Sequence, residues 1–141
     1  MGVLKEIGRF VGNVMELIIY SIGALIEAAI WAVGFVIDMV TDILSWINGK
    51  LEELLKDGAT EVNTVRCSAL AEFIKQNQAT GKYTDVSLSQ LNAMNTSVIN
   101  VALDNSGNII DDQMIRSNGG LSANARSQFN GQPVLKIKIP A

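Results

Sequence analysis

The hydrophobic and polar positions of the first part of the chain repeat every eleven residues. Residues 12–22, 23–33 and 34–44 each open on glycine and carry an acid at the fifth position, while most other positions are apolar. Eleven residues in three turns is about 3.67 residues per turn, close to the period of an α-helix. The pattern therefore predicts one long helix from about residue 3 to residue 56. Lys56 in the last turn and Gly58 just after it are typical of a helix end.

Around such a helix, the polar positions form a narrow sector and the apolar positions cover the remaining arc. A surface helix of a globular protein usually has an apolar stripe only a little over about 100° wide. In this helix the polar sector is the narrow part and the apolar arc is the wide one. Other protein or lipid must therefore cover the helix on most of its sides. We therefore expect many identical copies to share the helix in a multi-helix bundle or tube.

The candidate functional residues lie in or near this polar sector. Carboxylates that face inward in a bundle would keep a lumen wet and favour cations, and glycines let neighbouring backbones approach closely. Aromatic side chains are common anchors where a membrane meets water. We predict inner-face acids at Glu16, Glu27, Asp38 and Asp42, helix-packing glycines at Gly12, Gly23 and Gly34, and interface aromatics at Tyr20, Trp31 and Trp46.

The pattern does not separate lipid from protein as the material that covers the apolar arc. The acids divide the apolar run into stretches shorter than the roughly 20 residues of a standard membrane-spanning helix. Carboxylates in hydrocarbon are costly unless they face a bundle interior or water. We predict insertion in a lipid membrane as an oligomer, and the alternative is a protein-lined wall in an extracellular or viral assembly.

The second part of the chain is polar and predicts a small α+β domain. Residues 60–78 have apolar side chains at helical spacing, and a short helix is expected to begin near Ser87. Residues 97–103 and 109–115 flank the turn sequence Asp-Asn-Ser-Gly-Asn, which indicates a β-hairpin. A short helix over 122–129 and an alternating strand over 134–139 complete the expected elements.

Composition limits the chemistry that the chain can perform. Histidine is absent, which excludes mechanisms that need imidazole. The single cysteine, Cys67, cannot form an internal disulfide and is interpreted as a small buried residue on a helix. The net charge of −3 without a basic run gives no indication of nucleic-acid binding. No arrangement of nucleophile, base or metal ligands is visible, so we predict a non-enzymatic protein without a cofactor.

Together these patterns predict a fold of two parts: a hydrophobic eleven-residue-repeat helix over 1–58 and a small polar α+β domain over 59–141. The predicted function is a self-assembling membrane protein that forms a homo-oligomeric helical pore or conduit with an acid-lined inner face. Two alternatives are kept: a structural subunit of a fibre, virion or secretion apparatus, and a lytic or toxic membrane effector.

Overall fold

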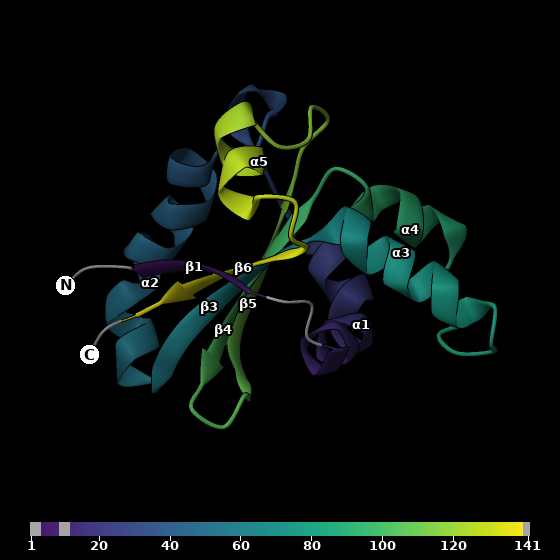
Figure 1. Cartoon of the computed structure of the whole chain (residues 1–141), viewed down its shortest axis with the longest axis horizontal. Helices are drawn as coiled ribbons and strands as arrows, with labels where there is room; N and C mark the ends of the chain where they lie inside the picture. The colour runs from purple at the N-terminus through teal and green to yellow at the C-terminus, as the bar shows by residue number, and fades with distance from the viewer. Residues whose placement is uncertain (1–3, 9–11, 140–141) are drawn as a thin grey trace.

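A mixed β-sheet runs through the middle of the molecule, with helices on both of its faces (Figure 1). The computed structural model describes residues 4–8 and 12–139, and the side chains of residues 18–32 and 34–139. Within these residues the sheet has the order β1-β6-β3-β4-β5-β2. Its strands are β1 Leu4–Gly8, β2 Ile30–Trp31, β3 Ala59–Arg66, β4 Val98–Asp104, β5 Ile109–Arg116 and β6 Val134–Lys138. All neighbours pair antiparallel except β2, which pairs parallel with β5 at one edge.

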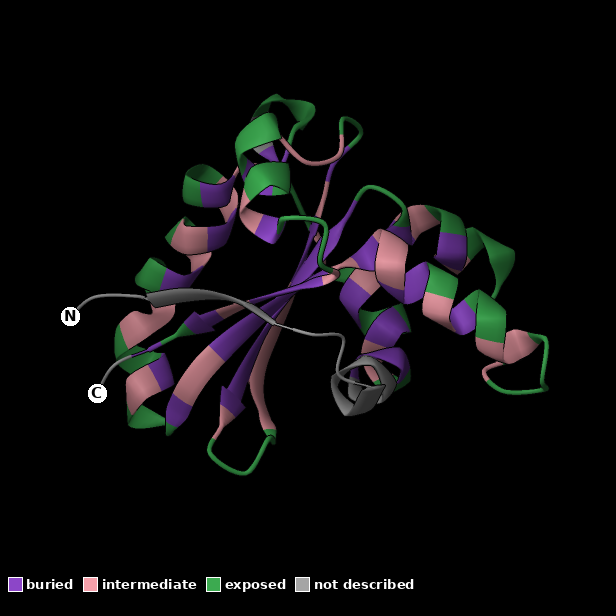
Figure 2. Ribbon diagram, viewed as in Figure 1, coloured by how far each residue is buried: buried purple, intermediate pink, exposed green. Residues whose placement is uncertain are grey.

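The helices form two layers that bury opposite faces of the sheet. One layer contains α1 (Gly12–Glu27), α3 (Cys67–Gln78) and α4 (Leu88–Met94). The other contains α2 (Ser45–Lys56), α5 (Ala123–Phe129) and the π-helix η2 (Met39–Leu44). Figure 2 shows the central strands largely buried between the two layers. A short 3-10 helix, η1 (Val33–Phe35), follows β2 at the sheet edge.

The expected long N-terminal helix is wrong, because the chain breaks its helical path after α1. Residues 28–38 hold β2 and η1 instead, and Gly34 takes a positive φ of 77° that a continuous helix does not allow. Asp38 then caps the next helix: its side chain accepts hydrogen bonds from the backbone N–H groups of Val40 and Thr41. Gly34 of the third repeat thus lies within η1 and Asp38 begins η2, so the two residues do not share one helix face.

The apolar residues of the repeat are covered by the chain's own sheet. Ile18, Ile22 and Leu25 of α1 are buried in the layer with α3 and α4. Ile43 of η2 and Ile47 of α2 are buried in the opposite layer. The prediction of a multi-helix bundle is therefore also wrong. Burial that was expected between identical copies takes place on both faces of one sheet.

The predicted membrane localisation is contradicted as well. Among the helices of the described residues, none combines the length and the apolar character that crossing a bilayer requires. The longest, α1, has 16 residues, which is shorter than the roughly 20 residues needed to span the hydrocarbon core.

Most of the elements expected in the second half are confirmed. The hairpin is β4 and β5, α4 begins after Ser87 with a capping box to Gln90, and α5 begins after Ser122. The helix expected over 60–78 is wrong in its first half, because residues 59–66 form the buried central strand β3. Helix α3 starts only at Cys67, which is fully buried, as its sequence interpretation proposed.

Candidate functional site

Large apolar side chains are exposed along one edge of the sheet. The segment from residue 30 to residue 40 leaves several of them in solvent, with exposed fractions between 37% and 64%. We call this surface the apolar edge; it consists of Ile30, Trp31, Phe35, Val36 and Val40. A single exposed apolar residue is common on a protein surface, but a run of them usually marks an interaction site.

Backbone hydrogen bonds hold the apolar edge against the end of β5 and the loop after it. The carbonyl of Phe35 accepts from the N–H of Gly119 at 2.5 Å and from the hydroxyl of Ser117. Ile37 continues the contact, because its N–H donates to Gly120 at 2.7 Å and its carbonyl accepts from Ser122 at 2.7 Å. The apolar side chains are therefore presented from a fixed backbone.

Phe35 itself has an unusual backbone conformation. Its φ is +65°, a region that non-glycine residues other than Asn and Asp rarely adopt. Such a conformation costs of order 1–3 kcal/mol and persists only where surrounding contacts impose it. The two hydrogen bonds to its carbonyl are such contacts, and its side chain is left 64% exposed.

Three of the residues predicted from the sequence meet in a hollow beside the apolar edge. Trp31, Trp46 and Asp42 line this hollow of about 270 Å³ together with Ile30, Thr41, Ser45 and Ile115. We call it the tryptophan hollow. Each indole lies under a cation: the Arg116 guanidinium is 4.7 Å from the ring of Trp31, and the Lys50 ammonium is 5.3 Å from that of Trp46. The hollow therefore has aromatic walls and the Asp42 carboxylate, and two cations lie over the indole rings of these walls.

The other predicted residues do not gather at one site. Glu27 is exposed at the end of α1, and the side chain of Glu16 lies outside the described side chains. Tyr20 is 85% exposed on α1. Gly23 lies where α1 passes α4, so that an added Cβ would be 3.5 Å from the side-chain nitrogen of Gln90. For Gly12, only its backbone position at the start of α1 is described.

Asp38 and Asp42 do come together, in a local cap. The N–H of Asp38 donates to the carboxylate of Asp42 at 2.8 Å, and the hydroxyl of Ser122 donates to Asp38 at 3.2 Å. Hydrogen bonds from the backbone N–H groups of Thr41 and Val40 hold the pKa of Asp38 below its usual value. Asp38 therefore anchors the start of η2 beside the tryptophan hollow.

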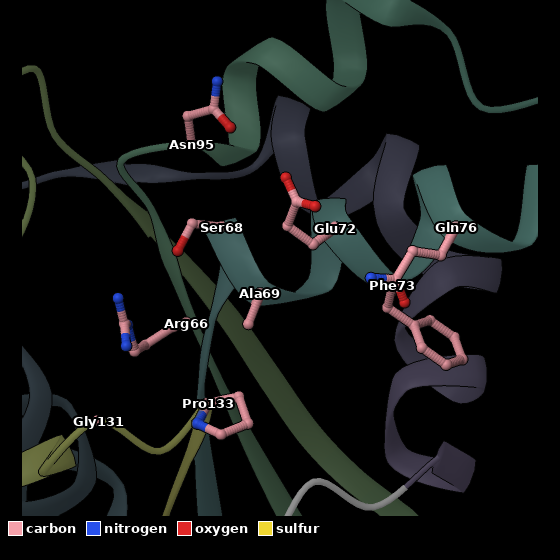
Figure 3. A pocket seen from close by; sticks show the side chains of 9 residues that line it. All are labelled: Arg66, Ser68, Ala69, Glu72, Phe73, Gln76, Asn95, Gly131 and Pro133. Atoms are coloured by element: carbon pink, nitrogen blue, oxygen red, sulfur yellow. The ribbon is translucent and has the colours of Figure 1, made fainter.

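A second hollow lies over the start of α3, on the opposite helical layer (Figure 3). It has a volume of about 550 Å³ and is lined by Arg66, Ser68, Ala69, Glu72, Phe73, Gln76, Asn95, Gly131 and Pro133. A smaller hollow of about 130 Å³ shares Arg66, Ser68 and Asn95 with it and adds Thr96 and Arg126. We call the two together the arginine groove.

Arg66 is the central charge of the arginine groove. Its guanidinium lies 6.0 Å from the ring of Phe129, and its Nε atom is buried without a hydrogen-bond acceptor among the described residues. Among the residues that the structure describes, no carboxylate lies within ion-pair distance of Arg66 or Arg126. Sequence reasoning missed this groove because its residues come from five separate segments and form no local motif.

Comparison with protein-family models, curated proteins and solved structures gives no match to this chain. The assignment of both surfaces therefore rests on their geometry alone.

Proposed function

We propose that this chain is a self-associating structural subunit whose copies meet through the apolar edge. The observation that carries the proposal is the run of exposed apolar side chains from Ile30 to Val40 on a rigidly held backbone. This keeps the self-assembly expected from the sequence and moves the contact from a helix face to a sheet edge.

The edge strand supports the same proposal. In the sheet of the described residues, β2 pairs with β5 on one side and has no strand on its other side. Unpaired strand edges are templates for pairing with another chain, and many proteins protect them with charges or covering elements. Here Ile30 and Trp31 of the edge strand are about half exposed instead.

The charges around the edge fit a second copy of the same surface. Asp42 lines the tryptophan hollow, and Arg116 lies over Trp31 beside it. A surface with both signs can match itself across a two-fold axis, because the cation of one copy can face the carboxylate of the other. Such complementarity favours association of identical copies over a partner of one strong charge.

The exposed aromatic side chains of the apolar edge set the size of the expected effect. An aromatic side chain buries about 150–250 Å² in a core, so exposures of 53% for Trp31 and 64% for Phe35 leave roughly 100 Å² of each in solvent. At about 25 cal/mol per Å², covering one of them contributes about 2.5 kcal/mol. Loss of this contribution should therefore weaken association roughly 70-fold.

The experiment is sedimentation velocity on the full chain over a concentration series, with Phe35→Asn as the test variant. Asn tolerates a positive φ better than Phe, so this substitution removes the apolar side chain without straining the backbone. Leu88→Asn is the matched control, because Leu88 is 68% exposed but lies on α4, in the other layer.

We expect the unmodified chain and Leu88→Asn to form the same oligomer, and Phe35→Asn to dissociate at higher concentration. Thermal unfolding of the variants should confirm that all three remain folded. A monomeric unmodified chain at the highest attainable concentration would refute self-association. Equal weakening by both variants would refute the apolar edge as the contact.

A further inference from the structure

The geometry points to the arginine groove as a binding site for a small organic anion, with a carboxylate or phosphate head and an apolar body. This inference is independent of self-association, because the groove lies over α3 while the apolar edge lies along β2 and η1. The volume of about 550 Å³ is within the range of roughly 300–1,000 Å³ typical of small-molecule sites.

The head of the ligand is specified by Arg66. Arg66 lines both hollows of the groove, so its positive charge is shared by the larger and the smaller hollow. The guanidinium offers a planar fork that matches a carboxylate or a phosphate in a bidentate manner. Since Arg66 has no ion pair among the described residues, its charge is available to an anion from outside.

The start of α3 adds further donors at the same place. The N–H of Arg66 donates to Pro133 and that of Cys67 to Ser97, both at 2.9 Å, which fixes the strand-to-helix junction. The N-cap residue, Arg66, makes no side-chain hydrogen bond to the backbone of the first turn. The N–H groups of Ser68 and Ala69 belong to this first turn, where no carbonyl of the helix itself serves them. The hydroxyl of Ser68 lies in the same wall.

Arg126 and Glu72 orient the ligand within the groove. Arg126, on α5, lines the smaller hollow next to Arg66, so the cations gather at this end. Figure 3 shows Glu72 on the other side of Ser68 from Arg66. A carboxylate at that end repels an anion, so the head of the ligand is directed toward the arginines.

The body of the ligand is specified by the opposite part of the larger hollow. Ala69, Phe73 and Pro133 give this part an apolar wall. The ring of Phe73 is itself braced by Tyr83, with ring centroids 6.1 Å apart. An aromatic or aliphatic body attached to the anionic head therefore fits better than an inorganic anion alone.

The test is a ¹H–¹⁵N NMR titration of the full chain with four probes: phenyl phosphate, benzoate, inorganic phosphate and the neutral benzyl alcohol. Sodium chloride at equal ionic strength provides the baseline. We expect saturable shifts of the Ser68 and Ala69 amides and of the Arg66 Nε–H signal, with tighter binding of phenyl phosphate or benzoate than of inorganic phosphate. The ratio between phenyl phosphate and benzoate identifies the preferred head group.

The variants are Arg66→Gln and Arg126→Gln, with Lys75→Gln as the charge-matched control. Lys75 is exposed at the far end of α3, so its loss changes the net charge equally without touching the groove. Removal of either arginine should weaken binding by about tenfold or more, which corresponds to 1.4 kcal/mol. Arg126 is exposed on α5, so Arg126→Gln remains informative if Arg66→Gln fails to fold.

Four results would overturn the inference, three of them in the titration and the arginine variants. These are shifts that match the sodium chloride baseline, equal binding of benzyl alcohol and the anions, or unchanged affinity in both arginine variants. Equal loss of affinity in Lys75→Gln would show general charge attraction rather than a built site.

Discussion

Gly119 is the position at which a single methyl group should test how the apolar edge is held. A Cβ atom at Gly119 would collide with the carbonyl oxygen of Phe35 and lie 3.0 Å from a methyl carbon of Val36. The first contact is with backbone, so it cannot be relieved by rotation of a side chain. Gly119→Ala must therefore push Phe35 away and disturb the hydrogen bonds that Gly119 and Ser117 donate to its carbonyl.

The expected loss can be worked from these contacts. Overpacking of a tight site costs about 1–3 kcal/mol, and each hydrogen bond that is weakened costs up to about 1 kcal/mol. We expect Gly119→Ala to lower the free energy of unfolding by about 2–3 kcal/mol. For a chain of 141 residues this corresponds to a fall in Tm of roughly 6–10 °C.

Gly49→Ala is the matched control, because it makes the same chemical change without a clash. Gly49 lies inside α2, and an added Cβ there would meet nothing within 4 Å. Alanine is favoured over glycine in a helix interior by about 0.8–1.0 kcal/mol, so Gly49→Ala should raise Tm. Both variants are compared by urea and thermal unfolding followed by circular dichroism. If Gly119→Ala were as stable as the unmodified chain, the arrangement of residues 35–36 against Gly119 would be refuted.

Three further predictions concern buried or partly buried polar groups. The hydroxyl of Thr64 donates to the side-chain oxygen of Asn100 at 2.7 Å, and both residues are buried. Thr64→Val should lower the free energy of unfolding, measured in urea, by about 1–3 kcal/mol, because it leaves this oxygen without its donor. The double variant Thr64→Val/Asn100→Leu should be more stable than Thr64→Val, because it removes both polar partners. Burial, and secondly the Asp111 carboxylate, raise the pKa of Asp112 above 3.8 despite the opposing charge of Lys50. Ionised Asp112 therefore costs stability, so Asp112→Asn should stabilise the fold at neutral pH and lose that gain below about pH 3.8, where folded and unfolded forms are both protonated; an unchanged difference across an acid titration would contradict this. Burial raises the pKa of the Cys67 thiol far above its usual value, so iodoacetamide should modify Cys67 only as urea unfolds the chain, and rapid modification without urea would show that the thiol is accessible.

The local elements of the second half could be predicted because their signals are local. Ser87 and Gln90 form a capping box within four residues of sequence, and Ser122 caps α5 in the same way. The hairpin follows from Asp104, whose carboxylate accepts hydrogen bonds from the N–H groups of Ser106 and Asn108 in the turn. Each of these interactions joins residues at most four positions apart, so the residue types alone indicate them.

The strand β3 could not be predicted in this way. Val62 and Val65 are three residues apart, which is also helical spacing, but they lie on opposite faces of the sheet and join different core layers. A central strand that is buried on both faces has no alternation of apolar and polar residues. Its identity depends on its neighbours β4 and β6, which come much later in the chain.

The two candidate sites also differ in how far the sequence predicts their residues. The sequence predicts roles for Trp31, Asp42 and Trp46 along one long helix, whereas the structure brings them to one hollow from β2, η2 and α2. Arg66 and Arg126 were not selected, because they are sixty residues apart and only the packing of α5 near the start of α3 brings them to one groove.

The sequence by itself determined that the first part of the chain must bury most of its surface. It also determined that a glycine and an acid recur every eleven residues there. Only the tertiary structure decided what provides the cover. A helix gains one hydrogen bond for each residue that it adds, but an apolar arc gains free energy only where another surface excludes water from it. The two faces of the sheet provide that surface within the same chain, so the chain turns at Gly34 and restarts at Asp38 instead of continuing as one rod.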